Sequence, residues 1–146
     1  MVEFAIVALV FFTLVIGLVD FGLGIFYYNQ ISNAAREGAR YGVIDSRTAS
    51  QICDYTLSKV VLPDVTGLDP INPDPCGTHG RLTVAVTDGT RRVMALDANG
   101  LPFEQTPSNP VVVTLTYNYE PATPLVQGLV GPVLTLKAES SMYIED

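Results

Sequence analysis

Apolar side chains fill the first 28 positions of the chain almost without interruption. Residues 1–28 contain 22 apolar side chains and two charged ones, Glu3 and Asp20. The uncharged run over residues 4–19 is about 16 residues long, close to the shortest helix that spans a bilayer. The aromatic pair at residues 27–28 suits a membrane interface. This pattern predicts a hydrophobic helix over residues 1–28 that anchors the protein in a membrane.

The apolar pattern changes after residue 28. Between residues 29 and 44, small and apolar side chains follow i, i+3, i+4, i+7 spacing, which is typical of one face of a helix. No proline precedes Pro63, so one uninterrupted helix can run through both segments. A helix over residues 2–41 would be about 60 Å long, far more than a bilayer crossing requires. We therefore expect residues 29–44 to continue the first helix in amphipathic form and to pack on a head domain.

Small residues mark two places on this helix. Ala34, Gly38 and Gly42 recur every four residues, and such a stripe lets another backbone approach closely. Its partner is either the sheet of the same chain or another subunit, and the sequence leaves both open. Gly22 and Gly24 lie in mid-helix, where each glycine costs about 1 kcal/mol relative to alanine. They mark the position where a kink would form.

Residues 45–146 are expected to form an α+β globular head. A second helix is predicted from near Ser46 to Leu62, because apolar side chains line one face and Pro63 ends the pattern. The segment that follows, up to Gly80, is rich in Pro, Gly, Asp and Asn and is interpreted as a loop.

Strands account for the rest of the head. Asp88-Gly89 and Asn99-Gly100 are turn signals between runs of alternating apolar and polar side chains. The connection over residues 121–132 has room for a short helix. The four predicted strands cover residues 82–86, 92–96, 111–119 and 134–144. The predicted fold is therefore a long N-terminal helix plus a small head with a second helix and an antiparallel sheet of about four strands, whose free face buries the amphipathic part of the first helix.

Composition supports an anchored, exported domain. Apolar residues make up 48% of the chain and charged residues 16%, and most of the apolar excess lies in residues 1–28. The net charge is −7 and no basic cluster is present, which argues against nucleic acid as a partner. Cys53 and Cys76 are interpreted as a structural disulfide, the usual state of a cysteine pair in an exported protein. A metal site is disfavoured because His79 is the single histidine.

The chain offers little catalytic chemistry. The motifs of common nucleophilic, phosphate-binding and zinc enzymes are absent, and the carboxylates are scattered. His79 lies between Thr78 and Gly80, in what we expect to be an exposed turn. We therefore predict that the protein is not an enzyme and uses no cofactor or metal.

The two charges within the apolar segment call for an explanation, since an unpaired carboxylate in a membrane or helix bundle is costly. Glu3 either lies among lipid headgroups or pairs with the N-terminal amine of a neighbouring subunit. The second arrangement would set the axial register of subunits in a polymer. Asp20 either marks the membrane exit or finds a polar partner within an assembly.

Four stretches of the sequence carry a family signature. They are Val2-Glu3-Phe4, Asp20-Phe21-Gly22, Asn33-Ala34-Ala35-Arg36-Glu37-Gly38-Ala39-Arg40-Tyr41 and the closing residues 142–145. In these stretches the chain resembles TadE-like pilins of the tight-adherence (Tad/Flp) branch of type IV pili. The resemblance is strongest over residues 1–44 and looser in the middle of the chain.

The resemblance implies a type IV pilin-like fold and an exported subunit. Such pilins are made with a short basic leader that a prepilin peptidase removes, and they wait in the cytoplasmic membrane until they are extracted into a filament. The chain is accordingly expected to be a mature or trimmed form. Its expected partners are copies of itself in a helical filament, the membrane before assembly and the pilus assembly machinery. Its expected location is an extracellular pilus filament at the cell surface.

The function expected from this resemblance is that of a structural pilin subunit that polymerises through its N-terminal helix. The helix over residues 1–28 would first be a membrane anchor and then the filament core. One alternative is a minor pilin, or a tip adaptor or adhesin of such a pilus. A second alternative is a membrane-anchored extracytoplasmic binding or sensor domain that forms no filament.

Overall fold

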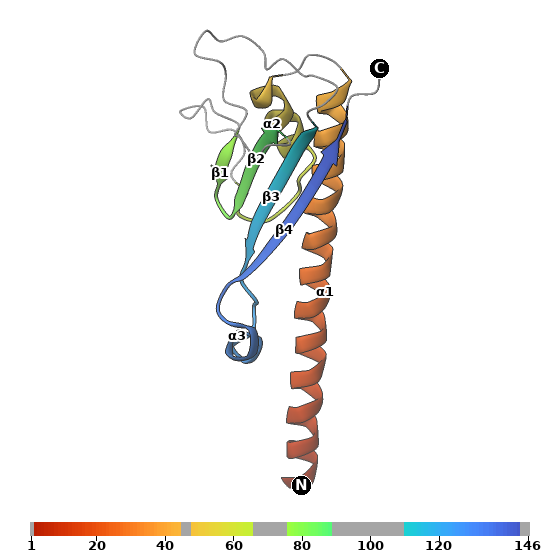
Figure 1. The fold of residues 1–146 in the computed structure, drawn as a ribbon. Helices are drawn as coiled ribbons and strands as arrows, with labels where there is room; N and C mark the ends of the chain where they lie inside the picture. The colour runs from red at the N-terminus through yellow and green to blue at the C-terminus, as the bar shows by residue number, and fades with distance from the viewer. Residues whose placement is uncertain (1, 45–47, 66–75, 89–109, 144–146) are drawn as a thin grey trace.

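A long helix carries a small head beside its C-terminal half (Figure 1). The computed structural model describes residues 2–44, 48–65, 76–88 and 110–143. In chain order the elements are α1 (Val2–Val43), α2 (Ala49–Ser58), β1 (Gly77–His79), β2 (Leu82–Asp88), β3 (Val111–Tyr119), α3 (Pro124–Val130) and β4 (Leu134–Met142). The predicted α+β architecture is confirmed.

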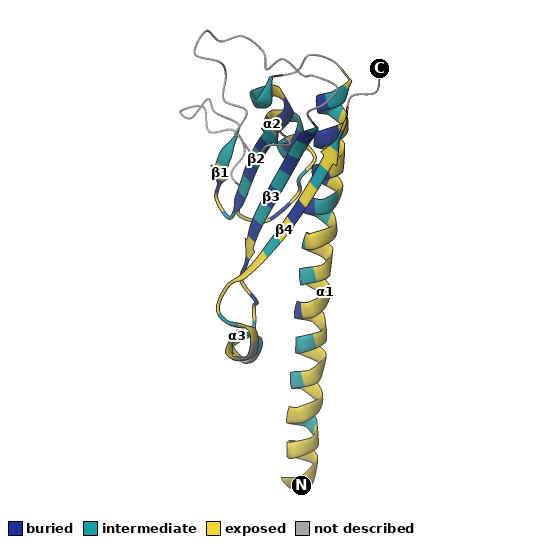
Figure 2. Cartoon of the chain, in the orientation of Figure 1, coloured by how far each residue is buried: buried dark blue, intermediate teal, exposed yellow. Residues whose placement is uncertain are grey.

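The two halves of α1 differ in burial (Figure 2). In its most apolar stretch no residue is buried within the chain. Toward the C-terminal end one face turns inward and packs on the head. The buried positions on that face are Ile31, Ala34, Ala35, Gly38, Ala39 and Gly42. The change of period after residue 28 therefore corresponds to a change of environment along a single continuous helix.

The sheet is antiparallel, with strand order β1-β2-β3-β4. Val84 pairs with Leu115, and Leu115 pairs in turn with Ala138, so one row of apolar side chains crosses three strands. Burial on β3 alternates strictly along most of the strand, as the sequence pattern predicted. One face of the sheet packs against α1 and α2, and together they enclose the core.

One strand arises where the sequence analysis predicted a loop. Gly77–His79 form β1 at the edge of the sheet, paired with β2. Gly80 adopts a positive φ of 64°, a conformation that glycine adopts without steric cost, and the tight turn brings the chain back onto β2. His79 is consequently 5% exposed, so the expectation of an exposed turn was wrong. The predicted strand over residues 92–96 lies outside the described residues.

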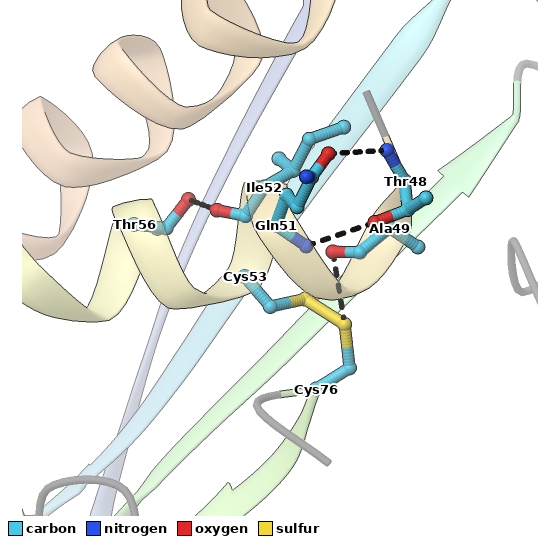
Figure 3. Close-up of a disulfide and its surroundings, with 7 residues drawn as sticks. All are labelled: Thr48, Ala49, Gln51, Ile52, Cys53, Thr56 and Cys76. Atoms are coloured by element: carbon cyan, nitrogen blue, oxygen red, sulfur yellow. Dashed lines mark hydrogen bonds between the residues drawn. A yellow bond between two sulfur atoms is a disulfide. The ribbon is translucent and has the colours of Figure 1, made fainter. Parts of the chain in front are cut away.

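A capping box begins α2. The Gln51 main-chain N–H donates to Thr48 Oγ1, and the Gln51 side-chain oxygen accepts from the Thr48 N–H (Figure 3). The helix ends at Ser58, several residues before Pro63, and is shorter than predicted. The residue preceding a proline is disfavoured in helical conformation, which accounts for an end before Pro63 but not for its exact position.

The expected Cys53–Cys76 disulfide is confirmed and joins α2 to the start of β1 (Figure 3). Cys53 is fully buried. The Cys76 sulfur also lies 3.3 Å from the main-chain oxygen of Ala49. A disulfide sulfur has no hydrogen to donate, so this approach is a packing contact. The bridge fastens α2 to β1, the edge strand of the sheet.

The stripe of small residues on α1 packs inside the monomer. A Cβ atom at Gly38 would collide with Thr56 Oγ1 of α2, and one at Gly42 would lie 2.9 Å from both Ile52 Cδ1 and Val111 Cγ1. The stripe thus brings α2 and the start of β3 close to the helix axis of α1. The sequence left two partners open for this stripe, the same chain or another subunit. In the structure, the atoms that approach Gly38 and Gly42 belong to the same chain.

Candidate functional site

The N-terminal half of α1 presents a large apolar surface. Phe4, Leu9 and Phe12 are 79%, 69% and 60% exposed. A monomeric protein in water rarely leaves so continuous a patch uncovered, because each such side chain gains about 1.5–3 kcal/mol on burial. By length and composition, α1 could also cross a membrane. This half of the helix therefore requires lipid or another protein surface around it.

Glu3 is exposed in the first turn of α1. At that position the carboxylate faces the positive end of the helix dipole, which favours a negative charge within the first turn. The helix dipole is thus a local reason for an acid at residue 3, beside the pairing role considered from the sequence.

Asp20 has polar partners within its own chain. It is 3% exposed, and its Oδ2 atom accepts hydrogen bonds from the Thr123 main-chain N–H at 3.1 Å and from the Thr123 hydroxyl at 2.5 Å. Its main-chain oxygen accepts a third bond from the Tyr119 hydroxyl at 3.2 Å. From the sequence, Asp20 is expected either to mark the membrane exit or to find a polar partner within an assembly. No local sequence pattern indicates a partner that lies 103 positions away in the same chain.

The contact with Asp20 also determines how α3 begins. Thr123 is the N-cap residue of α3 and has extended backbone angles, yet its side chain makes no capping bond. Its hydroxyl is directed instead to Asp20. The first turn of α3 is closed by the Gln127 main-chain N–H, which donates to the Thr123 main-chain oxygen at 3.0 Å. The start of α3 is therefore fastened to the middle of α1.

Three tyrosines pack where α1 meets the sheet. The Tyr27 ring makes edge-to-face contacts with Tyr117 and Tyr119, with ring centroids 5.7 and 5.4 Å apart. Burial raises the pKa of Tyr117. Burial, followed by the Asp20 carboxylate, raises the pKa of Tyr119. Both phenols therefore stay protonated at neutral pH, and Tyr119 can act as the donor to Asp20.

The two mid-helix glycines do not interrupt α1, which is helical from Val2 to Val43. A Cβ at Gly22 would meet nothing within 4 Å, whereas one at Gly24 would lie 3.8 Å from Tyr119 Cε1. Neither position is a melted turn. Gly24 lies beside the tyrosine cluster at an ordinary contact distance.

An apolar groove of about 410 Å³ runs between α1, α3 and the lower end of the sheet. Asp20 lies in the groove wall, where its carboxylate is occupied by Thr123. Among the residues that line the groove are Gly17, Phe21, Gly24, Tyr119, Val126 and Leu136. In the described part of the chain, no group of three or more His, Cys, Asp or Glu side chains is placed to hold a metal ion. The groove offers shape and apolar contact, with no evident catalytic constellation.

Comparison with known protein families matches the N-terminal part of the chain. Residues 1–40 match the model of the family described as TadE-like protein. No curated protein matches the chain, and no solved structure does. The resemblance inferred from the sequence is thus confirmed over most of α1. The family match covers both the exposed apolar half of α1 and the part that packs on the sheet.

Proposed function

We propose, taking the TadE-like match of residues 1–40 as the premise, that this protein is a structural subunit of a Tad-type pilus. The subunit is first anchored in the cytoplasmic membrane by α1 and then polymerises through the apolar half of that helix. The observation that carries the proposal is the division of α1. Its C-terminal part is buried against the head, while its apolar N-terminal part is left exposed.

This division suits a helical polymer. The exposed half projects beyond the sheet, so copies can pack their helices side by side while the heads remain outside (Figure 1). Burial of each large apolar side chain contributes about 1.5–3 kcal/mol, and such contacts recur at every added subunit. Two of the acids behind the net charge of −7 lie in the apolar segment, so the rest of the chain carries −7 + 2 = −5. That charge favours a soluble outer layer.

Glu3 is proposed to set the register between subunits. In a bundle of apolar helices its carboxylate would lose its hydration, and removing a charge from water is costly without a counter-charge. A cation of a neighbouring subunit at a similar depth, such as the N-terminal amine considered from the sequence, would supply that counter-charge. Pairing would favour one axial offset between neighbours over the others.

Electron microscopy of sheared surface material, with mass spectrometry of its main band, tests the proposal. Filaments composed mainly of this chain would support a major structural subunit. Filaments that contain only traces of it would contradict that role and favour a minor pilin or a tip adaptor. A chain that stays in the membrane fraction as a monomer, with no filaments present, would instead favour an anchored binding or sensor domain.

A further inference from the structure

The segment that joins β3 to β4 has an unusual composition for a surface loop. Residues 121–136 contain no charged side chain, so this uncharged run is as long as that over residues 4–19 of α1. It includes α3 together with the turns on either side. Several of its apolar side chains are exposed, among them Val130 at 49%, Val133 at 45% and Leu134 at 38%.

This segment lies beside the apolar half of α1 and below the sheet (Figure 1). One pocket between them is lined by Thr13 and Ile16 of α1 and by Thr123, Pro124 and Val126. The 410 Å³ groove continues the contact along α1 as far as Tyr28. Along the axis of α1, α3 therefore lies level with about the middle of the apolar half.

The depth of that region follows from helix geometry. A bilayer interior of about 30 Å needs roughly 20 helical residues, whereas the uncharged run over residues 4–19 supplies only about 24 Å. The span must therefore continue past Asp20, and Tyr27 and Tyr28 are the aromatic residues typical of its outer boundary. With the head outside the membrane and Tyr27 and Tyr28 at the outer boundary, the outer leaflet of about 15 Å takes up roughly 10 helical residues and covers about residues 17–27. Thr13 and Ile16, beside the start of α3, then lie near the bilayer centre.

Two polar side chains at this depth, Asp20 and Gln127, have intramolecular partners. The Asp20 carboxylate is held by Thr123, and the Gln127 Nε2 atom donates to the Pro121 main-chain oxygen at 2.8 Å. Asp20 is almost inaccessible from outside the chain. A carboxylate within an acyl layer is tolerated when it is paired and faces protein, and Asp20 meets both conditions.

We propose that residues 121–136 form a second membrane-embedded element, which inserts with α1 among the acyl chains of the outer leaflet before assembly. The inference rests on the proposed function, in which α1 anchors the subunit in the membrane before assembly. It adds a second lipid contact to that anchored state. The charge-free composition, the depth relative to α1 and the shielding of Asp20 by Thr123 support acyl chains as the occupant.

Single tryptophans provide the test, since the natural chain contains none. The full chain is placed in phosphatidylcholine vesicles with and without brominated acyl chains, which quench tryptophan on contact. Val130→Trp and Val133→Trp report on the segment independently. Phe12→Trp on α1 is the embedded reference, and Tyr143→Trp, just beyond β4, is the exposed reference.

The expected result is that both segment tryptophans lose emission to brominated lipid to an extent comparable with Phe12→Trp, while Tyr143→Trp does not. If Phe12→Trp is quenched and both segment tryptophans behave like Tyr143→Trp, the inference is overturned although the anchor remains. Shielding of the segment by a second copy would give this same overturning result. If Phe12→Trp is not quenched either, the proposal that α1 anchors the subunit in the membrane fails as well.

Discussion

The carboxylate of Asp20, in the middle of α1, accepts two hydrogen bonds from Thr123, one from its main chain and one from its hydroxyl. The two residues are 103 positions apart, and their contact fastens α3 to the apolar half of the long helix. An acid that interrupts an apolar segment therefore has a structural role in the monomer. That role can be tested separately from any role in a filament.

Removing the Asp20 carboxylate should release α3 from α1. In Asp20→Ala the Thr123 N–H and hydroxyl lose their acceptor. A fully buried donor without a partner costs about 1–3 kcal/mol, and the half-buried Thr123 should cost less than that. We expect faster hydrogen exchange at the Thr123 amide and little change at amides in the centre of β3. Asp20→Asn keeps an acceptor oxygen and should lie between Asp20→Ala and the natural protein. Unchanged exchange at Thr123 in Asp20→Ala would show that the contact does not hold α3.

Gly38 and Gly22 form a matched pair of helix glycines. Gly38→Ala places a methyl group against Thr56 Oγ1, whose hydrogen bond to the Ile52 main-chain oxygen measures 2.6 Å. Overpacking of this kind typically costs about 1–3 kcal/mol. Gly22→Ala meets open space, and alanine improves helix propensity by up to about 1 kcal/mol.

Urea unfolding in detergent checks this pair. The midpoint should fall for Gly38→Ala and stay unchanged or rise for Gly22→Ala. Equal midpoints for Gly38→Ala and the natural protein would mean that α2 can move away from α1 at little cost.

The disulfide should contribute measurably to the stability of the head. Cys53 and Cys76 are separated by 23 positions, and closing a loop of this length stabilises a protein by about 3 kcal/mol on the chain-entropy model. We expect a reductant to lower the free energy of unfolding by an amount of this order. The Cys53→Ser/Cys76→Ser variant should start at the lower value and be insensitive to the reductant. Sensitivity in that variant would assign the effect to something other than the bridge.

Stability should decrease in alkaline solution. Burial raises the native pKa values of Tyr117 and Tyr119 above the ordinary value of 10.0, so the unfolded chain ionises first. The stabilisation from these phenols is complete below that ordinary value and is lost as the pH rises through the raised native pKa. Chemical unfolding at a series of alkaline pH values should give a shallower decline for Tyr117→Phe/Tyr119→Phe. If stability declines with pH as steeply in this variant as in the natural protein, these two phenols are not the source of the decline.

Replacing Glu3 should separate assembly from folding. Glu3→Ala removes the proposed register charge at an exposed position at the start of α1, far from the head. We expect a large loss of filaments by electron microscopy, with the Cys53–Cys76 disulfide still formed. Glu3→Gln keeps the size of the side chain and should be similarly defective if charge is what matters. Normal filament yield from both variants would count against the register role.

Local patterns were sufficient for the elements that depend on local forces. The uniform apolar run followed by helical spacing predicted α1, and strict alternation predicted β3, because these periodicities reflect backbone geometry. The disulfide was also within reach of the sequence, since the chain has only two cysteines. The family match over residues 1–40 falls on the segment with the most distinctive pattern.

Only the tertiary structure decided which residues meet. The sequence drew attention to Asp20 and Gly38, yet it identified neither Thr123 nor Thr56 as a partner. It also predicted an exposed turn at His79, which is buried. These contacts depend on how the chain packs over long separations, and no periodicity encodes that. The sequence by itself thus determined a long helix with an apolar half and an amphipathic half. The tertiary structure decided that its small residues receive α2 and that its buried acid holds α3, because burial and hydrogen bonding are satisfied only once distant segments come together.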